Sequence, residues 1–205
     1  MGELLDILDE NYYVIGQDTR ENVHEQELLH AGFQCWFYKI YDGKPYILFQ
    51  MRNGRVNYPN LLDTTAAGHL SAGEGPEQGA REIEEELGLT IPFEHLTSLG
   101  KIRDTLPWRM DKIDNELCHL YAYQYDKPLQ SLTLQKSEVE GIVCISMDDF
   151  SNLLDSDDKR DIEVIVYDGQ SVETKRISLS LADFVPHELA YYRYNLEQLL
   201  ALVKE

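Results

Sequence analysis

Positive charge is scarce in this chain, which has 18 lysine and arginine residues against 37 aspartate and glutamate residues and a net charge of −19 at pH 7. A surface this acidic repels a phosphodiester backbone, so we expect no nucleic-acid partner. A small polyphosphate stays compatible with it, because a bound divalent cation supplies local positive charge. Long apolar runs are also missing, and none is long enough to span a bilayer, so we expect no membrane partner.

Cysteine is equally sparse, with Cys35, Cys118 and Cys144 far apart along the 205 residues. An odd number without paired spacing favours reduced thiols over a disulfide framework or a zinc site. The first ten residues lack the positive and apolar regions of a signal peptide, so we expect a cytoplasmic protein. The length and the 43% hydrophobic content suffice for a single domain over 1–205 with a proper core.

The alternation of apolar segments and turns predicts an α/β fold in which a mixed β-sheet is sandwiched between α-helices. Hairpins are predicted around Asp42-Gly43 and around Asp168-Gly169, and a C-terminal helix is predicted from Pro186 to about Val203. No motif assigns a role to the C-terminal part, and both dimerisation, as a homodimer, and substrate covering stay open. The predicted strands cover 33–41, 44–51, 63–67, 96–103, 117–125, 141–145, 162–167 and 172–179, a short helix opens at Met147, and the apolar stripe of the last helix is Leu189, Leu196, Leu199, Leu200 and Val203.

The most informative segment runs from Gly68 to Leu89. Pro76 suits the first position of a helix, and Gly88 suits the left-handed residue just past a helix end. Between them, three carboxylates fall on one helix face within roughly 100° of arc and repel one another. Mg²⁺ would remove that repulsion and keep coordination positions for substrate phosphates, whereas a solvated acidic face is the alternative interpretation. The carboxylates are Glu82, Glu85 and Glu86, and the apolar side is Ala80, Ile83 and Leu87.

This segment resembles the Nudix box of Nudix hydrolases, through Arg81-Glu82-Ile83, Glu85-Glu86 and Gly88, preceded by Gly68 and Glu74 at loop spacing. Six residues, and not the usual seven, separate Glu74 from Arg81. The resemblance implies the Nudix fold, with a core over about 32–154, an N-terminal extension (1–31) and a C-terminal hairpin and helix (155–205). It implies Mg²⁺, with Mn²⁺ as a substitute, held by the three carboxylates and the main-chain carbonyl of Ala67. Gly68, Glu74 and Gly88 would be structural, and Arg81 would orient a box carboxylate.

A second group of residues resembles the subfamily that includes type I isopentenyl-diphosphate isomerase. Two histidines precede the first core strand, a third lies in the box loop, and an acidic segment enters a later strand. The resemblance implies a second metal site from His24, His30, His69, Asp114 and Glu116. The isomerase, however, has a catalytic cysteine where this chain has Ala67. Because alanine has no proton to move at an allylic carbon, we expect the isomerisation to be lost.

The leading hypothesis is therefore a Mg²⁺-dependent hydrolase that cleaves a diphosphate linkage in a small molecule, either a nucleoside diphosphate derivative or an isoprenoid-type diphosphate. An isomerase-like activity and a catalytically silent nucleotide-sensing module are the alternatives, although sensors of this family usually lose box carboxylates and this chain keeps them. The candidate general bases are Glu82 and Glu116, followed by Glu138 and Glu140. The candidate substrate contacts are Arg52, Arg55 and His69, then Arg103, Arg109, Lys112, Tyr58 and Trp108, whereas His95, His119 and His187 have no supporting pattern.

Overall fold

The computed structural model describes residues 2–108 and 111–204, and nine of the strands in these residues form one sheet. Its main path follows the order β11-β10-β9-β4-β3-β8-β7, while the short β5 pairs with β4 and β6 pairs with β3. The β3–β8 pair is parallel and its neighbours are antiparallel, so the sheet is mixed, as predicted. The strands are β3 (His30–Tyr41), β4 (Lys44–Arg52), β5 (Leu62–Asp63), β6 (Ala66–His69), β7 (Thr97–Pro107), β8 (Ile113–Gln124), β9 (Val139–Ser146), β10 (Arg160–Tyr167) and β11 (Val172–Leu179).

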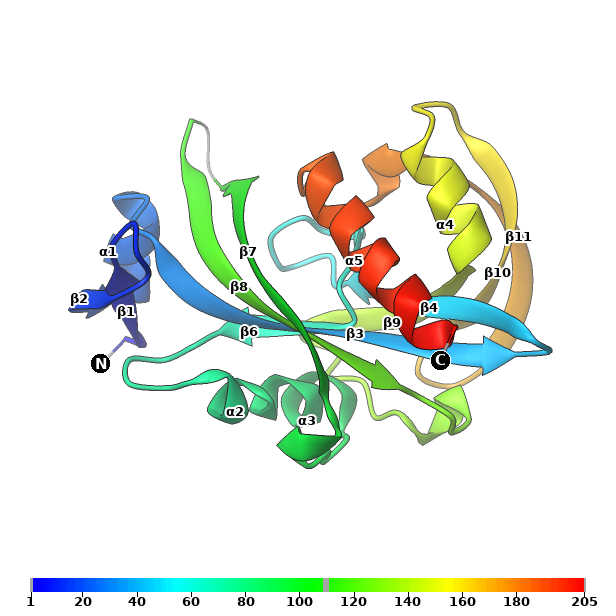
Figure 1. The fold of residues 1–205 in the computed structure, drawn as a ribbon. Coiled ribbons are helices and arrows are strands. Elements are labelled where there is room, and N and C mark those ends of the chain that lie inside the picture. Colours follow the sequence, from blue (N-terminus) through cyan, green and yellow to red (C-terminus); the bar gives the residue numbers. More distant parts are fainter. Residues whose placement is uncertain (1, 109–110, 205) are drawn as a thin grey trace.

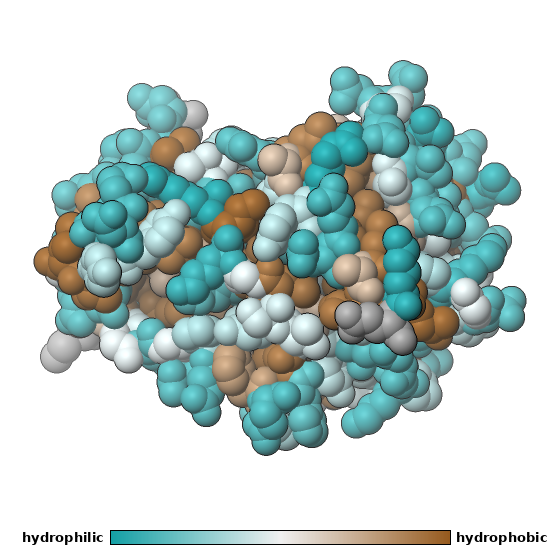
Figure 2. Space-filling view, viewed as in Figure 1, coloured by the Kyte–Doolittle hydropathy of each residue, from teal (hydrophilic) through white to brown (hydrophobic). Residues whose placement is uncertain are grey.

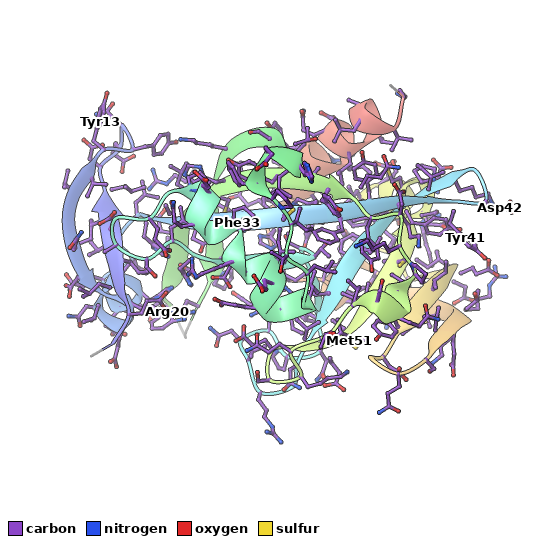
Figure 3. All side chains as sticks on the ribbon, turned by 90° about the horizontal axis from the view of Figure 1, so that it is seen from below. Tyr13, Arg20, Phe33, Tyr41, Asp42 and Met51 are labelled. Atoms are coloured by element: carbon purple, nitrogen blue, oxygen red, sulfur yellow. The ribbon has the colours of Figure 1, made fainter. Side chains whose placement is uncertain are left out.

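Helices cover both faces of this sheet, which confirms the predicted sandwich (Figure 1). One face carries α2 (Pro76–Gly79) and α3 (Arg81–Leu87), whose buried Ile83 packs into the same apolar cluster as Phe33 of β3. Figure 3 shows Phe33 beside these helices. The other face carries α4 (Met147–Leu154) and α5 (Leu189–Val203), with Trp36 in the shared cluster. Short 3₁₀ turns lie at Phe93–His95, Leu129–Ser131 and Leu181–Asp183. Among the described residues, no helix has the length and apolar character needed to cross a membrane.

The N-terminal extension forms a second, two-stranded sheet that the sequence did not predict. It consists of β1 (Leu4–Leu8) and β2 (Val14–Thr19), followed by α1 (Arg20–Glu25). The β1 strand holds the box loop, because the Ala72 N–H donates to the Leu4 carbonyl at 2.8 Å. The β2 strand leaves Val14 and Ile15 exposed, and apolar residues are visible over this hairpin in Figure 2.

Two of the predicted elements differ from the structure in ways that affect the cavity. The strand predicted over 63–67 is split into β5 and β6, because the Thr65 hydroxyl accepts the Phe37 N–H and donates to the Leu48 carbonyl in place of a ladder bond. Gly68 therefore lies on a strand and not in a loop. The last helix begins at Leu189 and not at Pro186, and Leu189 is 43% exposed, so it does not belong to the buried stripe.

A buried polar cluster ties the segment before α5 to the sheet. The His187 ring donates through Nδ1 to Asp104 Oδ2 at 2.5 Å and through Nε2 to Asp63 Oδ1 at 3.1 Å. Burial lowers the pKa of His187, but these two carboxylates outweigh it and raise that pKa to about 9. Burial likewise opposes ionisation of Asp63, but the bond and charge of His187 lower its pKa to about 2.

This cluster predicts how stability depends on pH. The contribution of His187 is full below its unfolded pKa of 6.5 and is lost as the pH rises through about 9. The contribution of Asp63 is full above its unfolded pKa of 3.8 and is lost as the pH falls through about 2. We expect H187Q to reduce the free energy of unfolding by about 3–5 kcal/mol near pH 5, and by less near pH 9. Urea denaturation at both pH values measures this, and an equal loss at both would contradict it.

A comparison of alanine substitutions at Gly88 and Gly43 separates backbone strain from packing at the end of the box helix. Gly88 and Gly43 both have left-handed φ values, +67° and +72°, but a Cβ at Gly88 would lie 2.6 Å from Thr133 Cβ, whereas a Cβ at Gly43 would meet nothing within 4 Å. We expect G43A to cost about 1–2 kcal/mol through backbone strain alone. G88A should cost a further 1–3 kcal/mol through the clash. Equal losses in thermal or urea unfolding would mean that Thr133 moves aside freely.

Candidate active site

A cavity of about 890 Å³ opens between the box helix, β6 and the N-terminal segment. Acidic side chains from two separate groups line it: the box carboxylates on α3, and Asp114 and Glu116 at the start of β8. Against them, the described part of the lining holds three arginines, Arg20, Arg52 and Arg81. The cavity is therefore dominated by carboxylates, which suits cations and the anionic groups that cations attract.

The box carboxylates reach the backbone of β6 because Gly68 has no side chain. A Cβ at Gly68 would lie 2.1 Å from Glu82 Cδ, so any larger residue would displace this carboxylate. One residue earlier, the Ala67 N–H donates to Glu86 Oε2 at 3.2 Å. The third carboxylate, Glu85, has a 54% exposed side chain at the rim. The predicted single acidic face therefore forms, running from buried Glu86 to the solvent.

Arg81 ties the box loop to the helix. Its Nη1 lies 2.7 Å from Glu74 Oε2, and its Nη2 lies 3.1 Å from Glu82 Oε1 and donates to the His69 carbonyl at 3.1 Å. Arg81 and Glu74 thus form an ion pair in spite of the spacing that is one residue shorter than usual. Ala80 separates α2, which ends at Gly79, from α3, which begins at Arg81.

Burial raises the pKa of the box carboxylates. Desolvation, together with the charges of Glu85 and Glu138, raises the pKa of Glu82 to about 7, against the opposing charge of Arg81. Desolvation and the charge of Glu82 raise the pKa of Glu86 well above its usual value. These carboxylates lack enough positive charge around them, which is the condition that a divalent cation would relieve.

A second cluster joins residues that are far apart in the sequence. His24 on α1, His30 at the start of β3, His69 at the end of β6 and Asp114 on β8 each offer one ligand atom, and these atoms all lie within 4.8 Å of one another. His24 Nε2 is 3.2 Å from His69 Nε2 and 3.4 Å from Asp114 Oδ2. Glu116 Oε1 lies 3.3 Å from His69 Nε2.

The hydrogen bonds of this cluster orient its nitrogens for a metal. His24 Nδ1 donates to the Arg20 carbonyl at 2.7 Å and His30 Nδ1 donates to the Leu28 carbonyl at 2.9 Å, so the unprotonated Nε2 of each ring faces the cluster. His30 Nε2 and Asp114 Oδ1 are buried without a hydrogen-bond partner among the described residues, although they are 3.4 Å apart. Unpaired buried atoms that converge in this way fit a bound cation.

The pKa values of the two acids in the second cluster, Asp114 and Glu116, are shifted in opposite directions. Desolvation and the charge of Asp114 raise the pKa of Glu116 to about 8. Burial also opposes ionisation of Asp114, but its contacts with His24, His30 and His69 lower its pKa. Desolvation and the neighbouring His30 lower the pKa of His69 well below 6.5, which keeps the ring neutral and able to act as a ligand.

The other predicted site residues separate into two groups. Arg52, Tyr58, Trp108 and Glu138 line the cavity, and Trp108 stacks on His24 with ring centroids 5.2 Å apart. Of the others, none that the structure describes lies in the lining. Arg55 is exposed, Arg103 pairs with Glu10, Lys112 bonds to the Glu25 carbonyl, Glu140 accepts from Asn53, and Arg109 lies outside the described residues.

The lining residues that the sequence did not predict include Arg20, Gln34 and His187. No motif marks them: Arg20 follows an unpredicted hairpin, Gln34 lies inside an apolar strand, and His187 stands alone near the C-terminus. The one sequence signal near His187 is the preceding Pro186, which predicts the start of a helix. The structure instead uses residues 186–188 as the approach to α5.

Comparisons with known proteins agree with this architecture. The chain is 37% identical over 205 residues to an uncharacterized Nudix hydrolase of Clostridium acetobutylicum, with 97% of each chain covered. It is 28% identical over 128 residues to an isopentenyl-diphosphate Delta-isomerase of Serratia proteamaculans, covering 62% of this chain and 68% of that protein. Among solved structures, a Deinococcus radiodurans protein, DR0079, superposes with a TM-score of 0.55 at 18% identity, covering 75% of this chain and 90% of the other.

A MutT/nudix family protein from Enterococcus faecalis gives a TM-score of 0.51 at 14% identity, covering 86% of this chain and 62% of that chain. At such identities these two structures show a shared fold. The model of the NUDIX domain matches residues 35–166, which is more than half of the chain. The protein is therefore a member of the NUDIX family.

Proposed function

We propose that this NUDIX protein is a divalent-metal-dependent hydrolase that cleaves a diphosphate linkage in a small-molecule substrate. The observation that carries the proposal is that two groups of potential ligand atoms, one on α3 and one around His69, contribute to the lining of the same cavity. Such an arrangement gives a diphosphate a place between cations in an otherwise acidic cavity.

The residues divide the work as follows. Glu82, Glu85 and Glu86, with the main-chain carbonyl of Ala67, would hold Mg²⁺ or Mn²⁺ at the box. His24, His30, His69, Asp114 and Glu116 would hold a second cation. A divalent cation bound in the cavity neutralises charge on the diphosphate oxygens and lowers the pKa of a bound water.

Other side chains would bind substrate and move the proton. Arg52 lines the cavity with a side chain that is 23% exposed, and a guanidinium there matches a phosphate oxygen pair. Glu82 and Glu116 are the candidates for accepting the proton of the attacking water, since each lines the cavity beside one ligand cluster. Arg81 acts as a positioning residue, because its contacts are with Glu74, Glu82 and the His69 carbonyl.

The isomerase alternative has one observation in its favour, the convergence of His24, His30, His69 and Asp114. Ala67 speaks against it, because the residue before Gly68 carries no acid or base. The sensing alternative is disfavoured by the complete set of box carboxylates. Proton exchange into isopentenyl diphosphate in ²H₂O would favour the isomerase.

A substrate panel tests the hydrolase. We expect the purified protein with Mg²⁺ or Mn²⁺ to release phosphate or pyrophosphate from at least one member of a panel of nucleoside di- and triphosphates, nucleotide sugars, dinucleotides and isoprenoid diphosphates. The double variant E85Q/E86Q should lower kcat at least about 100-fold, because it removes charge that stabilises the transition state through the cation.

The matched control is E84Q, which removes one carboxylate from the same helix at an exposed position outside the cavity lining. It should keep kcat within about twofold, since a surface charge is screened. Turnover that survives both EDTA and E85Q/E86Q would contradict the proposal. Metal binding without turnover of any panel member would favour the sensing module.

A further inference from the structure

The segment before α5 is part of the cavity wall, although nothing in the sequence connects it with the box. Val185 and His187 both line the cavity. The Val185 N–H donates to the Leu62 carbonyl at 2.9 Å, which pins this segment to β5. The C-terminal residues thus reach the same end of the cavity as Arg52.

Asp63, the residue after Leu62, is held through both of its carboxylate oxygens. Oδ1 accepts from His187 Nε2 at 3.1 Å and from the Thr64 N–H at 2.8 Å. Oδ2 accepts from Arg52 Nη1 at 2.7 Å. Because different partners hold the two oxygens, the carboxylate cannot rotate without losing one of them, and its plane sets the direction of the arginine.

Arg52 is fixed at a second point as well. Its Nε donates to the Asn57 carbonyl at 2.8 Å. Among the hydrogen bonds of the described residues, these contacts use Nε and Nη1, which leaves the Nη2 donors for a ligand in the cavity. A guanidinium held on one edge and open on the other presents a prearranged fork to an anion.

His187 is itself rigidly held. Asp104 on β7 accepts from its Nδ1 at 2.5 Å, and Tyr191 on α5 stacks against the ring with centroids 4.1 Å apart. The Tyr191 hydroxyl bonds in turn to Thr64, at 2.9 Å, and to Gln34. The cationic ring compensates the two buried carboxylates of Asp63 and Asp104. Without it, Asp63 would keep Arg52 as its cationic partner, and Asp104 would have none among the described residues.

We infer that His187 is a positioning residue that acts through Asp63 to hold Arg52 toward the anionic part of the substrate. The segment before α5 then contributes to substrate binding through the position of Arg52. The inference rests on the role given to Arg52 under the proposed function, and it adds the chain of contacts Asp104–His187–Asp63–Arg52 that supplies the geometry.

Two readouts on wild type, H187Q, R52Q and R52Q/H187Q test this inference. The first is NMR of the arginine side chains, in which the signal absent from R52Q identifies Arg52. We expect its side-chain N–H protons to exchange with solvent at least about tenfold faster in H187Q. The second is calorimetric binding of inorganic pyrophosphate in saturating Mg²⁺. R52Q should weaken binding about tenfold and H187Q about three- to tenfold, and the double variant should bind no more weakly than R52Q.

Y194F is the matched control, because Tyr194 on α5, the helix that follows His187, donates a partly buried hydrogen bond to the Leu99 carbonyl and does not line the cavity. It should change neither readout. If H187Q does not fold, D104N takes its place, since it removes the outer anchor of His187 and should change both readouts in the same direction.

The outcomes separate the inference from the proposed function. If the exchange rate of the Arg52 N–H protons is unchanged in H187Q, the action of His187 through Asp63 is overturned. It is also overturned if the affinity losses of H187Q and R52Q add fully in the double variant. In another outcome, the Arg52 N–H protons exchange faster in H187Q but the wild type does not bind pyrophosphate. That result overturns the anion-binding role of Arg52, and the failure then lies in the proposed function.

Discussion

The close approach of the box helix to β6 is the constraint on which the rest of the site depends. It exists because Gly68 leaves room for the Glu82 carboxylate where a Cβ would be 2.1 Å from Glu82 Cδ. On one side of Gly68, Ala67 donates to Glu86, and on the other, His69 meets His24 and Glu116. A four-residue strand thereby lies beside two clusters of candidate metal ligands that contribute to one cavity.

This arrangement is electrostatically costly for the folded protein. Burial and mutual repulsion raise the pKa of Glu82 to about 7 and that of Glu116 to about 8, in a chain of net charge −19. The cationic side chains of the lining are largely engaged by carboxylates of their own, as Arg81 is by Glu74 and Arg52 by Asp63. A cavity that keeps carboxylates close together in spite of this cost is suited to divalent cations and to the phosphates they bind.

Much of the fold and of the box was predictable because both depend on short-range patterns. The turn at Asp42-Gly43, the left-handed Gly88 and the buried Ile83 follow from local spacing, and the structure confirms them. The histidine cluster was reached through a resemblance, since no local pattern links residue 24 with residue 114. His187 escaped prediction because its partners, Asp63 and Asp104, are distant in the sequence and meet only when the sheet has formed. The split at Thr65 depends equally on a side-chain bond that propensity does not reveal.

The most direct test of the central claim is a crystal structure of the protein soaked in Mn²⁺, with anomalous scattering used to locate the metal. The account predicts anomalous density at two positions in the cavity, one among the carboxylates of Glu82 and Glu86 and one among His24, His30, His69 and Asp114. Density at the box alone would contradict the claim that β6 joins two metal sites, and density at neither position would contradict the metal-dependent account as a whole.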